Sequence, residues 1–157
     1  MLFFVVALIA LAADLYTKHL TLTYLPLGQF IPMGIFDIRH VHNAGAAFGM
    51  LAHSNVLFII VAVGVLVGML VFLPRIRQAE TAVVVAFGLI AGGTLGNLVD
   101  RLRFGYVVDF IDFRWWPVFN VADSCICVGV GLLIWKLSHG PHSEPESGAE
   151  SDPSPSA

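Results

Sequence analysis

Four long apolar runs divide the chain and limit what it can fold into. They cover residues 1–20, 55–73, 81–99 and 120–137. A helix of about 20 residues spans the hydrocarbon core of a bilayer, because each residue adds about 1.5 Å. Hydrophobic residues make up 57% of the chain and charged residues only 12%, which is unusual for a soluble domain. The pattern predicts an all-α membrane protein with four transmembrane helices in one domain, residues 1–137.

The first run has a second interpretation, because an apolar N-terminal segment can also be a secretory signal peptide. It lacks the basic start that such peptides carry, so a first membrane span is favoured.

Residues 21–54 differ from the apolar runs. They contain Pro26 and Pro32, several glycines and short β-prone pieces such as IFDIRHV. Because open sheet edges are not tolerated in hydrocarbon, we expect a small β element at the membrane surface. Residues 138–157 are rich in proline, serine and glutamate, which predicts a disordered tail.

Small residues predict where the spans pack. Gly64 and Gly68 lie four apart in the second run, as in a small-residue packing face. The third run contains Gly88, Gly92, Gly93 and Gly96. We expect close helix contacts at both runs, and we expect the second helix to stop at Pro74.

The segment 92–124 holds four of the eleven acidic residues, Asp100, Asp109, Asp112 and Asp123. Carboxylates at the edge of a bilayer are costly and are commonly functional. With four spans, both termini lie on one side, and the ends of spans one and three and the start of span four share the other side. The polar residues gathered there are Asp14, Asn43, Asn97, Asp100, Asp109, Asp112, Asn120 and Asp123. Asp14 and Lys18, four apart, can pair on one helix face.

Two carboxylates held together in a partly dry site share a proton and can act as general acid and general base on water. Asp109 and Asp123 are separated by a 14-residue step that a loop can close. Asn97 and Asn120 could orient these carboxylates, and Arg101 could steady a loop or a substrate group. This chemistry needs no metal and no cofactor.

Three other interpretations remain open at this point. The acids could line a proton or cation path in a small transporter, although none lies in the middle of the second or third span. They could bind a metal with the nearby histidines, but no paired-ligand spacing such as HExxH is present. Asn120 or Asp123 could simply cap a helix. No basic patch suggests a nucleic acid partner.

Five motifs occur in order along this frame. They are ADLYTK around Asp14, NAGAAFG from Asn43, GGTLGNLVDR from Gly92, GYVVDFIDF around Asp109 and FNVADS around Asp123. With these motifs the chain resembles the lipoprotein signal peptidases, the type II signal peptidases of bacteria.

The resemblance implies an aspartic endopeptidase of the bacterial inner membrane, with Asp109 and Asp123 as the catalytic pair. Its substrate would be a diacylglyceryl prolipoprotein, cut just before the lipidated cysteine, and globomycin-type cyclic peptides would inhibit it. The matching positions that would support the site or contact substrate are Asp14, Asn43, Asn97, Asp100, Arg101 and Asn120. Asp112 would be merely solvated.

The resemblance also implies an extracytoplasmic site and β element at the lipid surface, with both termini in the cytoplasm. Charge bias does not decide this orientation, because the side with the acids carries five basic residues. One departure is that the segment between the two catalytic positions looks several residues shorter than in familiar members. A tighter loop over the site is therefore expected.

Overall fold

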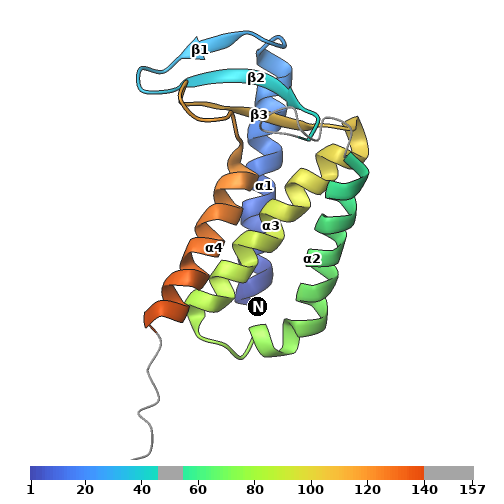
Figure 1. Cartoon of the computed structure of the whole chain (residues 1–157), viewed down its shortest axis with the longest axis vertical. Coiled ribbons are helices and arrows are strands. Elements are labelled where there is room, and N and C mark those ends of the chain that lie inside the picture. The colour runs from blue at the N-terminus through green and yellow to red at the C-terminus, as the bar shows by residue number, and fades with distance from the viewer. Residues whose placement is uncertain (46–54, 140–157) are drawn as a thin grey trace, which may run out of the picture.

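The computed structural model describes residues 1–45 and 55–139. Within them it has four helices and three strands, in the order α1 (Leu2–Tyr24), β1 (Phe30–Pro32), β2 (Asp37–Asn43), α2 (Asn55–Ile76), α3 (Thr81–Phe104), β3 (Val107–Asp112) and α4 (Val121–His139). The helices lie side by side and the strands cross one end of the bundle (Figure 1). The N-terminus and the end of α4 lie at the opposite end, as the four-span topology predicts.

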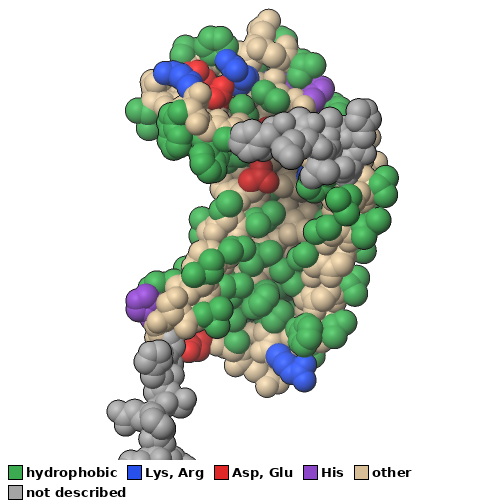
Figure 2. All heavy atoms as spheres, viewed as in Figure 1, with side chains coloured by type: hydrophobic (Ala, Val, Ile, Leu, Met, Phe, Trp, Pro, Cys, Tyr) green, Lys and Arg blue, Asp and Glu red, His purple; other side chains and the backbone are tan. Residues whose placement is uncertain are grey.

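All four helices are long and apolar enough to cross a membrane, which confirms the predicted class. In α3, 61% of the most apolar window is buried, against 11–22% in the other three helices. The third helix is therefore the centre of the bundle, and the others expose apolar side chains outward. Figure 2 shows these hydrophobic side chains covering much of the visible helical surface.

The glycines of α3 explain its central position. A Cβ at Gly88 would collide with the Val6 side chain of α1, and a Cβ at Gly92 would collide with the α1 backbone at Ala7. A Cβ at Gly93 would meet the carbonyl oxygen of Ala122 in α4. Helix backbones approach this closely only where side chains are absent. The predicted tight packing of the third span is confirmed.

The second helix departs from expectation in two ways. Gly64 and Gly68 face open space in the described structure, so the predicted packing face on α2 is wrong. Helix α2 also continues through Pro74 to Ile76, where a stop was expected. Pro74 lies in the last turn of α2, so only the end of the helix is affected by the missing N–H and by the clash of the proline ring with the preceding turn.

The strands form one antiparallel sheet in the order β1-β2-β3. In the register, Asp37 pairs with Asp112 and Asn43 with Val107, with an irregularity between Ile38 and Val41. The predicted β element is present, but residues 21–24 belong to α1, and residues 46–54 lie outside the described residues. The third strand was not predicted. It occupies much of the segment expected to be a loop before α4.

The C-terminal boundary also moves slightly. Ser138 and His139, assigned to the tail from sequence, complete α4. The remainder of the predicted tail, residues 140–157, lies outside the described residues.

Candidate active site

Six polar side chains are buried where the sheet meets the helices. Each is at most 7% exposed, and they are Asp14, Lys18, Asn97, Asp100, Asp109 and Asn120. They come from α1, α3, β3 and the residue before α4. Folded proteins bury polar groups only where these are paired or hydrogen-bonded. We therefore take this cluster as the candidate active site.

Asn120 connects the two aspartates. Its side-chain nitrogen donates to Asp109 Oδ1 at 2.7 Å. The side-chain oxygen of Asn120 accepts from the backbone N–H of Asp123 at 2.9 Å, and the backbone N–H of Asn120 donates to Asp123 Oδ2 at 3.3 Å. This reciprocal arrangement caps α4 in the manner of a capping box. The capping hypothesis therefore holds for Asn120, and the same contacts place Asp123 beside the strand that carries Asp109.

Two further amides reach the aspartates from other elements. Asn43, the last residue of β2, donates to Asp109 Oδ2 at 2.8 Å. Asn97 of α3 donates to Asp123 Oδ1 at 2.7 Å. Each aspartate thus accepts a hydrogen bond on both oxygens, and segments far apart in sequence hold it in place.

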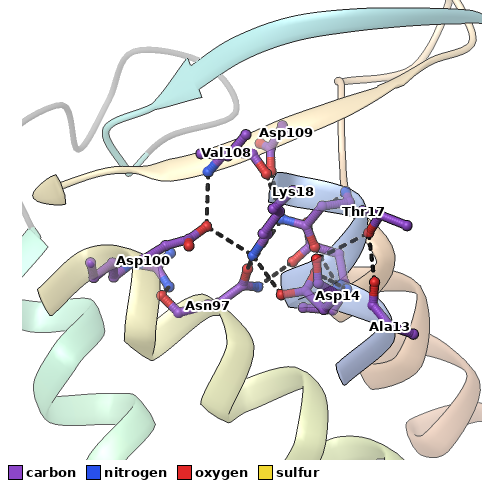
Figure 3. Close-up of polar contacts among 12 residues, drawn as sticks. Ala13, Asp14, Thr17, Lys18, Asn97, Asp100, Val108 and Asp109 are labelled. Carbon is purple, nitrogen blue, oxygen red and sulfur yellow. Dashed lines mark hydrogen bonds and ion pairs between the residues drawn. The ribbon is translucent and has the colours of Figure 1, made fainter. Parts of the chain in front are cut away.

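Lys18 lies below this pair and was not singled out as a site residue from sequence. Its ammonium is 2.8 Å from Asp14 Oδ2, 2.9 Å from Asp100 Oδ2 and 3.0 Å from Asn97 Oδ1 (Figure 3). The predicted pairing of Asp14 with Lys18 is confirmed. The sequence did carry a signal for Lys18, because a cation lies four residues from an acid inside an apolar run. In a membrane helix such a pair has to find polar partners.

The acids beside Lys18 tie other elements to it. Asp14 Oδ1 accepts from the backbone N–H of Ala122 in α4 at 2.8 Å. Asp100 Oδ2 accepts from the backbone N–H of Val108 in β3 at 3.1 Å (Figure 3). Asp14 and Asp100 therefore hold the backbones next to Asp123 and Asp109, respectively.

The surroundings of Asp109 shift its ionisation. The pKa of this carboxyl is raised to about 7, chiefly by burial. The charge of Asp123 also raises the pKa, whereas the hydrogen bonds from Asn43 and Asn120 and the charge of Lys18 lower it. A carboxyl that keeps its proton near neutral pH can act as a general acid.

Arg101 lies beside the pair on α3. Its guanidinium donates to its own helix at Asn97 O, 3.4 Å away, and stacks 4.9 Å over the ring of Phe58 in α2. With Asp123 it lines a hollow of about 240 Å³ whose α2 wall is apolar. Asp123 therefore borders a hollow lined by α2, α3 and α4.

Asp112 is not solvated, contrary to expectation. It is 4% exposed, pairs with Arg39 at 3.1 Å and accepts from the backbone N–H of Arg114 at 2.7 Å. The β2–β3 register places Asp37 opposite it, and Arg114 binds Asp37 through two nitrogens at 2.6 and 2.9 Å. That hydrogen bonding lowers the pKa of Asp37. Asp112 thus belongs to an ion cluster at the far end of the sheet, apart from the dyad network.

The structure brings Asp14, Asn43, Asn97, Asp100, Asp109, Asn120 and Asp123 into one connected network. Arg101 flanks it, and Lys18 joins its two halves. The roles of these residues stay predictions. Within residues 1–45 and 55–139, no three His, Cys, Asp or Glu side chains are grouped so that they could hold a metal ion.

Comparison with known proteins gives consistent matches over most of the chain. The family model described as signal peptidase (SPase) II matches residues 6–139. The lipoprotein signal peptidase of Pelotomaculum thermopropionicum is 44% identical over 139 residues, covering 87% of this chain and 91% of the relative. That of Halothermothrix orenii is 43% identical over 136 residues, covering 85% and 93%. A solved structure described as a bacterial membrane enzyme is 30% identical with a TM-score of 0.78, covering 90% of this chain and 93% of that chain.

Proposed function

The chain belongs to the signal peptidase II family and is therefore a protease, and on this premise we propose that Asp109 and Asp123 perform the hydrolysis. The observation that carries the proposal is the bridge through Asn120, whose amide and backbone contact both carboxyl groups. Such a pair activates water without a metal.

In the proposed mechanism Asp109 begins protonated and Asp123 begins ionised. Burial favours the neutral form of Asp109. Asp123 lies in the first turn of α4, where the positive end of the helix dipole favours a carboxylate. The two groups then have different tasks, as the chemistry requires.

In the first step of the proposed hydrolysis, Asp123 takes a proton from water while the water oxygen adds to the carbonyl carbon of the peptide bond. Asp109 gives its proton to the carbonyl oxygen, which forms a neutral gem-diol. Asp123 then passes its proton to the leaving nitrogen, the C–N bond breaks, and Asp109 recovers a proton from the gem-diol. The products are a free amine and a carboxylic acid.

The proposed substrate is a prolipoprotein carrying a diacylglyceryl cysteine, cut on the N-terminal side of that cysteine. The curated relatives are lipoprotein signal peptidases by name. Support comes from the position of the dyad at the end of a bundle of apolar helices, where acyl chains can stay in lipid while the peptide bond reaches the aspartates. Arg101 lines the hollow beside Asp123, and Asn43 donates to Asp109. These two residues are our choices for contacts with the peptide backbone.

We place the protein in the bacterial inner membrane, with the sheet and dyad extracytoplasmic and both chain ends cytoplasmic. Globomycin-type cyclic peptides are the expected inhibitors. The transporter hypothesis is not favoured, because the acids of α1, α3 and α4 all lie at the sheet end in one network.

The test is cleavage of a lipidated precursor by purified protein. Asp109→Asn and Asp123→Asn should each lower kcat by at least about 1,000-fold, because one loses the acid and the other the base. Glu80→Gln is the matched control, since that carboxylate lies at the opposite end of α3, and it should keep wild-type activity.

Two results would contradict the proposal. One is cleavage of the lipidated precursor by both aspartate variants at rates near wild type. The other is equal cleavage of the unlipidated precursor by the wild-type enzyme, which would remove the diacylglyceryl group from substrate recognition.

A further inference from the structure

The orientation of each amide in the site is fixed by a group that can only donate. The backbone N–H of Asp123 faces the side-chain oxygen of Asn120, and the backbone N–H of Gly45 faces that of Asn43 at 3.0 Å. An amide whose oxygen accepts from such a donor has to present its NH₂ group on the other side. For Asn43 and Asn120 that other side is Asp109.

The orientation of the Asn97 amide is fixed differently, because the donor that faces its oxygen is a side chain. An ammonium has protons and no acceptor, so the atom of Asn97 that faces Lys18 Nζ at 3.0 Å has to be the oxygen. The Asn97 nitrogen then faces Asp123 Oδ1 at 2.7 Å. The NH₂ group of Asn120, which donates to Asp109, also donates to the same Asn97 oxygen at the longer distance of 3.1 Å.

Lys18 cannot serve the reaction by direct contact with the substrate. Its side chain is 2% exposed, and its three ammonium protons meet three oxygens, those of Asp14, Asp100 and Asn97. Any effect on catalysis therefore has to pass through one of these partners.

We propose that Lys18 is a positioning residue that locks the amide of Asn97, so that its NH₂ group is always directed at Asp123. This inference rests on the proposed function of the dyad and adds the group that keeps one member of it oriented. Without the ammonium, only the longer contact from Asn120, whose NH₂ group also binds Asp109, holds this orientation. The Asn97 amide then rotates more readily and presents its oxygen to Asp123, which repels a carboxylate.

The experiment compares Lys18→Met with Lys18→Gln. Methionine fills similar space without a donor, whereas glutamine offers an uncharged NH₂ group on a side chain one bond shorter. We expect Lys18→Met to lower kcat by about 10- to 100-fold, the equivalent of one charged hydrogen bond of about 1.5–3 kcal/mol at tenfold per about 1.4 kcal/mol. KM should stay within about twofold of wild type, and Lys18→Gln should recover part of the lost kcat.

A double-mutant cycle tests whether the effect passes through Asn97. If it does, Lys18→Met combined with Asn97→Ala should be no slower than Asn97→Ala alone. Lys136→Met is the matched control, because it removes an ion pair with Glu80 at the other end of the bundle. It should leave kcat and KM unchanged.

Loss of the ammonium also leaves two buried carboxylates with no cation, so Lys18→Met could fail to fold. Lys18→Met with Asp100→Asn keeps the net charge of the cluster at its original value and is the second variant. Relative to Asp100→Asn alone, it should show the same fall in kcat as Lys18→Met shows relative to wild type.

Additive effects in the cycle would overturn the proposal. So would equal activity of the methionine and glutamine variants, or a rise in KM as the main effect. Each of these outcomes is distinct from failure of the dyad assignment, which is judged separately on Asp109→Asn and Asp123→Asn in the wild-type background.

Discussion

Asp109 is a buried carboxyl whose ionisation is shifted by its environment. It is 1% exposed, it lies on the strand of the sheet that contacts α1 and α3, and its pKa is raised to about 7, chiefly by burial. A carboxyl with an ordinary pKa would carry no proton at neutral pH. The raised pKa therefore fits the role of general acid that we propose for Asp109.

This environment predicts the alkaline limit of activity. The proposed mechanism requires the protonated form of Asp109, and the raised pKa means that the proton is present below about pH 7 and lost above it. We expect kcat/KM for the lipidated precursor to fall above about pH 7, approaching tenfold per pH unit. The measurement is a rate profile from pH 5 to pH 9, with recovery on return to pH 6.5 to exclude denaturation. A rate that stays constant up to pH 9 would show that Asp109 is not the acid.

At this scale the sequence predicts which residues come together better than it predicts what each one touches. Topology alone gathers Asp14, Asp109 and Asp123 on one side of the membrane. The pairing of Lys18 with Asp100 depends on helix rotation, and that of Asp112 with Arg39 depends on the register of β2 against β3. Both pairings link residues far apart in the chain, and neither follows from local pattern.

Among the elements, α3 has the greatest influence on the site. It packs closely on α1 and α4 through glycines and carries Asn97 and Asp100. At Gly96 the neighbouring atom is not backbone but the Oδ2 atom of Asp14. Close helix packing and the ion cluster around Lys18 therefore meet at one position.

A methyl group at Gly96 should disturb both the close helix packing and the ion cluster around Lys18. Gly96→Ala would push Asp14 away from Lys18, and we expect about 1–3 kcal/mol of lost stability, as for overpacking in a core, together with reduced activity. Gly68→Ala adds the same atom where nothing lies within 4 Å, so stability should be unchanged or slightly raised. The two variants are compared by thermal unfolding in detergent and by cleavage rate. If Gly96→Ala unfolds and cleaves as Gly68→Ala does, the packing argument is wrong.

The strand β3 shows why one element could not be found from the sequence. VVDFID is an apolar run interrupted by two acids, in a short segment between two membrane spans. Its pairing partner is β2, about 70 residues earlier, and no local turn signal connects the two. The four helices, by contrast, follow from length and hydropathy alone and are correct within a few residues at their ends.

For the molecule as a whole, polarity is arranged along the bundle axis. The visible surface of the helices is mainly hydrophobic, and charged side chains lie toward the two ends (Figure 2). The dyad lies at the end that carries the sheet, whereas the turn between α2 and α3 lies at the other (Figure 1). This arrangement supports a fixed orientation across a membrane.

The proposed orientation can be checked by labelling. Cys125 and Cys127 are the two native cysteines, and both are first replaced by alanine. In spheroplasts, a membrane-impermeant maleimide should label Ile35→Cys, in the exposed turn between β1 and β2. It should label Gln78→Cys, between α2 and α3, only after the membrane is permeabilised. The opposite pattern would reverse the proposed topology, and the cysteine-free protein serves as the blank.

The side-chain amides of Asn43, Asn97 and Asn120 all donate to two carboxylates, and this arrangement has a consequence for drug resistance. An inhibitor whose polar contacts are confined to Asp109, Asp123 and their amide partners binds groups that the proposed reaction uses. A point substitution that weakens the inhibitor there also removes a hydrogen bond from one of the two aspartates proposed to be catalytic. Viable escape variants would have to arise in the apolar wall contributed by α2, or through increased synthesis of the enzyme.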